Sequence, residues 1–78
     1  MKQKVVIIGA GGFGREVLDI FEADSKGRNA WEILGFIDDN LQMHGKIIRG
    51  YPVLGGVNWF SSSEAEDVKA VIAIGENK

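Results

Sequence analysis

Residues Val5–Val17 read V-V-I-I-G-A-G-G-F-G-R-E-V, and this stretch decides the fold. The apolar run Val5–Ile8 predicts a strand, which stops where four of the six residues 9–14 are glycine. A helical apolar pattern follows the glycines. A strand, a glycine turn and a helix in this order are typical of the start of a nucleotide-binding βαβ unit.

The glycines have separate predicted roles around a bound pyrophosphate. Gly9 permits the tight turn, Gly11 lets the backbone approach the phosphate because it has no Cβ, and Gly14 lets the helix pack closely on the strand. Gly12 begins the helix, whose unpaired N–H groups and positive dipole end would face the ligand. The alternative is that the glycines only build a tight turn, but the strand before them and the helix after them favour phosphate binding.

Composition is that of a small globular domain. The 78 residues predict a single domain, and 45% apolar with 26% charged residues is ordinary for one. The chain has no cysteine, which excludes disulfides and thiolate metal sites and fits a cytoplasmic protein. A net charge of −2 argues against a nucleic-acid partner. The apolar runs are too short for a membrane span or a signal peptide.

The remaining pattern predicts an α/β domain with a small Rossmann-like parallel sheet and flanking helices. The expected elements are a strand at Lys4–Ile8, a helix at Gly12–Ala23 that ends in Asp24–Gly27, a strand at Trp31–Ile37, a helical turn at Val57–Ser62 and a strand at Val68–Ile74. The first and last strands are continuously apolar, so each is expected to be buried on both faces, with the last one central. Between them, Leu41–Ile48 predicts an irregular excursion or a short strand, and Pro52 confines any strand around it to an edge.

The predicted helix has an apolar stripe and a polar side. The stripe consists of Phe13, Val17, Ile20 and Phe21, with Leu18 beside it, and the polar side of Arg15, Glu16, Asp19 and Glu22. Arg15 is expected to be solvated, and His44, the only histidine, to be a loop residue rather than a catalyst. The aromatic residues Trp31, Phe36, Trp59 and Phe60 are expected in the core.

Three loops follow predicted strands, at Gly9–Gly14, Asp38–Asn40 and Gly75–Asn77. Because the carboxyl ends of parallel strands meet at one edge of a sheet, we expect all three loops to face the same crevice. Asp38 lies 24 residues after Gly14, close to the offset of about 20 at which dinucleotide folds place a ribose-binding acid. The alternative that Asp38 and Asp39 only build a turn stays open, as it does for Asn77.

Four motifs in this order and spacing resemble the N-terminal domain of bacterial sugar O- and N-acyltransferases of the PglD/NeuD type. They are V-I-I-G-A-G-G-F-G-R-E-V (6–17), G-F-I-D-D-N (35–40), G-Y-P-V-L-G (50–55) and A-V-I-A-I-G-E-N (70–77), and they cover essentially the whole chain. The resemblance implies that residues 1–78 form a Rossmann-like domain that binds the nucleotide part of a UDP-sugar acceptor. The implied binding residues are Gly9, Gly11, Gly12, Phe13, Gly14, Asp38, Asp39, Gly75 and Asn77. Many relatives have histidine where this chain has Phe13.

In that family, a left-handed β-helix of hexapeptide repeats follows this domain, trimerises, binds acetyl-CoA and supplies the catalytic histidine. The present chain has no such repeats, so it resembles an isolated acceptor domain, truncated after its last strand, with no catalytic residue, metal or cofactor of its own. We expect the fragment to self-associate, and the longer parent to be a homotrimeric acetyl-CoA-dependent transferase of cytoplasmic, bacterial glycan biosynthesis. Two other readings stay open: an NAD(P)-binding half-domain of a dehydrogenase, and a non-catalytic nucleotide-binding module.

Overall fold

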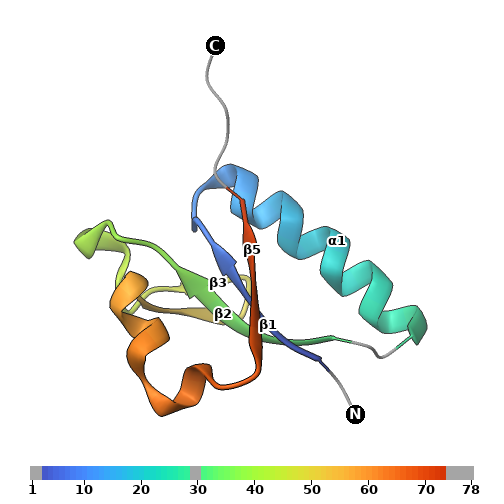
Figure 1. The fold of residues 1–78 in the computed structure, drawn as a ribbon. Coiled ribbons are helices and arrows are strands. Elements are labelled where there is room, and N and C mark those ends of the chain that lie inside the picture. The colour runs from blue at the N-terminus through green and yellow to red at the C-terminus, as the bar shows by residue number, and fades with distance from the viewer. Residues whose placement is uncertain (1–2, 29–30, 74–78) are drawn as a thin grey trace.

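The computed structural model describes residues 3–28 and 31–73, which form a five-stranded sheet, one α-helix and three short 3-10 helices (Figure 1). In chain order the elements are β1 (Gln3–Ile8), α1 (Gly12–Arg28), β2 (Trp31–Ile37), η1 (Leu41–Met43), β3 (Ile47–Ile48), β4 (Tyr51–Gly55), η2 (Val57–Ser61), η3 (Ser63–Ala65) and β5 (Val68–Ile72). The strand order is β3-β4-β2-β1-β5. The pairs β1–β2, β1–β5 and β2–β4 are parallel, whereas β3–β4 is antiparallel. This is the predicted α/β, Rossmann-like arrangement.

Strand β1 lies between two parallel neighbours and is buried on both faces, as its unbroken apolar run predicts. Val5, Val6 and Ile7 have no exposed surface. Figure 1 shows α1 along one face of the sheet and the η2–η3 segment on the opposite side. Ile7 is in register with Phe36 of β2, and both belong with Leu18 of α1 to one buried cluster. Each such side chain contributes about 1.5–3 kcal/mol of burial free energy, so this cluster holds α1 on the sheet.

Two predictions about α1 are wrong. The helix continues through Asp24–Gly27 to Arg28, because single turn-forming residues oppose a helix only weakly. Ile20 is 68% exposed, whereas Leu18 is fully buried. Ile20 lies two residues, or about 200°, around the helix from Leu18, so it points away from the sheet.

Strand β4 is short, as Pro52 predicts, but it is not an edge strand. It lies between β3 and β2. The main-chain N–H of Val53 donates to Lys46 on the β3 side, so the backbone of Pro52 points toward β2. The pairing of β4 with β2 begins only at Phe36 and Val53. Pro52 therefore removes no donor from either ladder, and the proline is tolerated inside the sheet.

Strand β5 lies at the edge of the sheet in the described part of the chain, and the prediction of a central strand is wrong there. It pairs with β1, and Val71, in register with Ile7, is partly buried. The next residue, Ile72, points to the other face and is 71% exposed. Ile74 lies outside the described residues. A continuous apolar run does not distinguish the two positions, because strand order depends on the path of the crossovers rather than on the strand's own composition.

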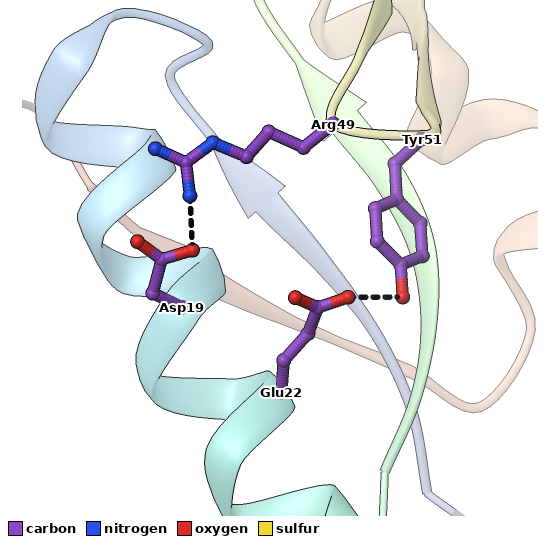
Figure 2. A network of polar contacts seen from close by, with 4 residues as sticks. All are labelled: Asp19, Glu22, Arg49 and Tyr51. Atoms are coloured by element: carbon purple, nitrogen blue, oxygen red, sulfur yellow. Dashed lines mark hydrogen bonds and ion pairs between the residues drawn. The ribbon is translucent and has the colours of Figure 1, made fainter.

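Two polar contacts join α1 to the β3–β4 hairpin (Figure 2). The Oη of Tyr51 donates to Oε2 of Glu22 across 3.0 Å, and the guanidinium of Arg49 pairs with the carboxylate of Asp19. The helical pattern assigns Glu22 to the solvated side, but it is half-buried and faces the hairpin. The Arg49–Asp19 side chains are about half exposed, so their ion pair contributes at most about 1 kcal/mol.

Candidate functional site

The glycine loop after β1 and the loop after β2 lie side by side at the carboxyl edge of the sheet. The main-chain N–H of Gly9 donates to the carbonyl oxygen of Ile37 at 2.6 Å, and that of Ala10 donates to Oδ2 of Asp38 at 2.9 Å. The predicted convergence of these two loops is therefore confirmed. The third predicted loop, residues Gly75–Asn77, lies outside the described residues. The chain leads toward the same edge, because the N–H of Ala73 donates to the carbonyl oxygen of Ile8 at 2.8 Å.

Two of the loop glycines are required by the fold itself. Gly9 has a φ of 107°, a backbone conformation that favours glycine. A Cβ on Gly14 would lie 1.9 Å from the carbonyl oxygen of Gly9, so the start of α1 approaches the end of β1 more closely than any side chain allows. This is the close helix–strand packing that the sequence predicts for Gly14.

Gly11 and Gly12 differ from these, because the fold makes no demand for glycine at either position. A Cβ at each would meet no atom within 4 Å, and neither is among the residues with positive φ. Both residues are exposed. The surface above them is therefore open to a group that approaches the backbone.

The N-terminus of α1 opens onto this surface. The helix begins at Gly12, and the N–H of Arg15 donates to the carbonyl oxygen of Gly11. No acidic residue lies in the first turn, so no carboxylate of that turn offsets the positive end of the dipole. Arg15 is exposed, as predicted. Helix N-termini of this kind suit phosphate groups.

Asp38 holds the loops together. Its Oδ2 accepts from the N–H of Ala10, and its Oδ1 accepts from the N–H of Asn40 at 2.9 Å. The main-chain N–H of Asp38 donates to the carbonyl oxygen of Gly55 at 2.9 Å. Nε2 of His44 lies 2.6 Å from the Asp38 carbonyl oxygen. Because a carbonyl only accepts, Nε2 carries the proton in this contact. His44 is thus a loop residue that ties η1 to the end of β2.

Asp39 binds a loop that the sequence analysis missed. Its Oδ1 accepts from the N–H of Val57 at 2.9 Å, which connects the end of β2 to the start of η2, just after β4. A Cβ on Gly56 would lie 2.6 Å from the same oxygen, so a side chain at residue 56 would force the carboxylate to shift from this position. The available signal was the pair Gly55-Gly56 directly after an apolar strand, the same punctuation that ends β1.

The comparison with protein families agrees with this geometry. The model for the PglD N-terminal domain matches residues 4–78, almost the entire chain. The chain belongs to the PglD N-terminal domain family. This is a family of N-terminal domains of sugar acetyltransferases. A search of curated proteins found no matching relative.

Other features of this PglD-type domain lie away from the loops. A hollow of about 770 Å³ at the amino ends of β1 and β5 is lined by charges of both signs, including Lys4, Glu64, Glu66 and Lys69. Ligands of open parallel sheets bind at the opposite, carboxyl edge, so we assign the site to the loops. The described residues contain no cluster of His, Cys, Asp and Glu that would hold a metal ion, and no helix among them is long and apolar enough to cross a membrane. The side chain of Phe13 lies outside the described part of the chain.

Proposed function

We propose that this chain is the acceptor-binding domain of an acetyl-CoA-dependent sugar acetyltransferase, and that it binds the nucleotide part of a UDP-sugar. Membership of the PglD N-terminal domain family supports the general assignment. The cellular setting that we propose is cytoplasmic glycan biosynthesis in a bacterium.

One observation carries the proposal of a nucleotide ligand. Glycine costs about 0.5–1 kcal/mol of backbone entropy relative to alanine in ordered structure. The tight turn requires glycine at Gly9 and the helix packing requires it at Gly14, so the fold explains these two residues. Gly11 and Gly12, in contrast, are exposed, and a Cβ on either would meet open space. An external group that contacts the backbone explains these two glycines. The positive end of the α1 dipole, whose first turn contains no acidic residue, favours an anion there, and a pyrophosphate fits both features.

The remaining roles follow from this placement. The backbone of residues 9–14 and the first turn of α1 would hold the pyrophosphate, and the loop of Asp38 and Asp39 after β2 would contact the nucleoside. Gly75 and Asn77 are proposed to close the site from the end of β5. Acetyl transfer would take place on a separate domain that binds acetyl-CoA, in a homotrimeric parent protein.

Titration calorimetry with UDP, a UDP-sugar and NAD tests the proposal. We expect UDP and the UDP-sugar to bind more tightly than NAD. Gly11→Val is the matched control, because a side chain there meets no protein atom but blocks approach to the backbone. It should abolish UDP binding while leaving the thermal unfolding midpoint almost unchanged. Tighter binding of NAD would instead support the dehydrogenase half-domain, and normal UDP binding by Gly11→Val would reduce the loop to a simple turn.

A further inference from the structure

We infer that the two adjacent carboxylates after β2 have different roles. Asp39 gives the oxygen that accepts a hydrogen bond from the nucleoside, and Asp38 is a positioning residue that holds the glycine loop. This inference rests on the proposed function and names a contact within the same site. It differs from the dinucleotide pattern, in which the acid directly after the second strand binds the ribose.

The hydrogen bonds of Asp38 are directed inward. Its two carboxylate oxygens accept from the backbone of Ala10 and of Asn40, and the side chain is half-buried. The Ala10 bond spans two segments 28 residues apart and fixes the glycine loop against the end of β2. A ligand that used Asp38 would have to share oxygens that the fold already occupies.

Among the described residues, only one of the two carboxylate oxygens of Asp39 has a hydrogen-bond partner. Oδ1 accepts from the N–H of Val57, and the missing Cβ of Gly56 leaves the space that this position of the carboxylate occupies. Oδ2 has no hydrogen-bond partner among the described residues, and Asp39 is exposed. A charged acceptor that is already fixed by a backbone bond pays little ordering entropy when a donor arrives.

The surroundings of Asp39 indicate the kind of donor. Val57, whose N–H donates to the carboxylate, exposes 53% of its surface. Leu41, two residues after Asp39 at the start of η1, exposes 79%. An oriented acceptor beside exposed apolar side chains suits a ring with a polar edge and apolar faces. Within a uridine nucleotide, the donors of that description are a ribose hydroxyl and the N3–H of the base.

The test compares UDP, 2′-deoxy-UDP, 3′-deoxy-UDP and 3-methyl-UDP on the wild-type chain and on two isosteric variants, Asp39→Asn and Asp38→Asn. Wild type should bind UDP more tightly than at least one analogue, and the weaker analogue identifies the donor. Asp39→Asn should bind UDP about tenfold or more weakly, because hydrogen bonds to charged groups are the strong ones, and should no longer discriminate against that analogue. Its thermal midpoint should stay close to that of wild type, since the asparagine oxygen still accepts from Val57.

Asp38→Asn should behave differently. One amide oxygen cannot replace two carboxylate oxygens, so the Ala10 amide proton should exchange faster with solvent and UDP should bind more weakly, but discrimination between UDP and the analogue should persist. Discrimination that survives in Asp39→Asn, or is lost only in Asp38→Asn, overturns the inference while leaving nucleotide binding intact. A wild-type chain that binds no UDP overturns the proposed function, and this inference with it. If Asp38→Asn does not fold, the Asp39→Asn measurements decide alone.

Discussion

The phenol of Tyr51 on β4 donates a hydrogen bond to the carboxylate of Glu22 on α1 across 3.0 Å, joining residues 29 positions apart in the chain (Figure 2). Burial of Tyr51 raises its pKa above the ordinary value of 10.0, and the hydrogen bond to Glu22 and the charge of that carboxylate raise the pKa further. The contact therefore depends on the protonated phenol, because a phenolate would face Glu22 with a like charge.

This contact predicts a loss of stability at alkaline pH. The folded chain holds the Tyr51 proton more tightly than the unfolded chain does, so the contribution to the free energy of unfolding is complete below about pH 10 and declines as pH rises through the folded pKa. Since Tyr51 is the only tyrosine, the ultraviolet absorbance of tyrosinate measures its titration directly. Glu22→Gln should lower the pKa part of the way toward 10, because burial remains.

The matched control for that prediction is Tyr51→Phe. The difference in unfolding free energy between wild type and Tyr51→Phe should shrink as pH rises above 10, which isolates Tyr51 from the lysines. A folded-state pKa at or below 10, or one that Glu22→Gln leaves unchanged, would contradict the role of this contact.

Substitutions of the loop glycines should differ in their effect on the free energy of unfolding. Gly14→Ala places a Cβ 1.9 Å from a backbone oxygen and should lower the free energy of unfolding by about 1–3 kcal/mol or more. Gly11→Ala, where the same atom meets open space, should change it by no more than about 0.5 kcal/mol. Urea denaturation of both variants measures this difference. Equal destabilisation by the two would show that the loop packs differently from the structure described above.

Leu18 and Ile20 test which side of α1 faces the sheet. Leu18→Ala removes a fully buried side chain and should cost about 2–5 kcal/mol, whereas Ile20→Ala, at a residue 68% exposed, should change stability by about 0.5 kcal/mol or less. Thermal and chemical unfolding give both values. A larger loss of stability in Ile20→Ala than in Leu18→Ala would show that Ile20 faces the sheet, as the sequence pattern predicts.

The edge at β5 should support association of two copies of the chain. In the described residues β5 pairs on one side only, with β1, and Ile72 exposes 71% of its surface beside the exposed Ala70. Unpaired strand edges are templates for pairing with another chain. Sedimentation over a concentration series should therefore show reversible self-association, and Ile72→Lys should weaken it. A strictly monomeric wild type would refute this prediction.

Parts of the site were predictable because they are encoded over short distances. The apolar run before Gly9, the turn itself and the close packing at Gly14 all belong to one stretch of about ten residues, and the structure has each of them. The extension of α1 to Arg28 was not predictable from its local composition, since Asp24–Gly27 has the residues of a helix end. Packing and the whole helix outweighed that weak local preference.

The sequence by itself determined the βαβ opening, the two-sided burial of β1 and the bounds of β2, because strand and helix periods and turn chemistry are properties of neighbouring residues. Only the tertiary structure decided the strand order, the edge position of β5 and the different partners of Asp38 and Asp39. Those two carboxylates are adjacent in the chain and equivalent in chemistry. Oδ2 of Asp38 and Oδ1 of Asp39 have partners 28 and 18 residues away, and the crossovers of the sheet determine which backbone N–H group comes within reach of each.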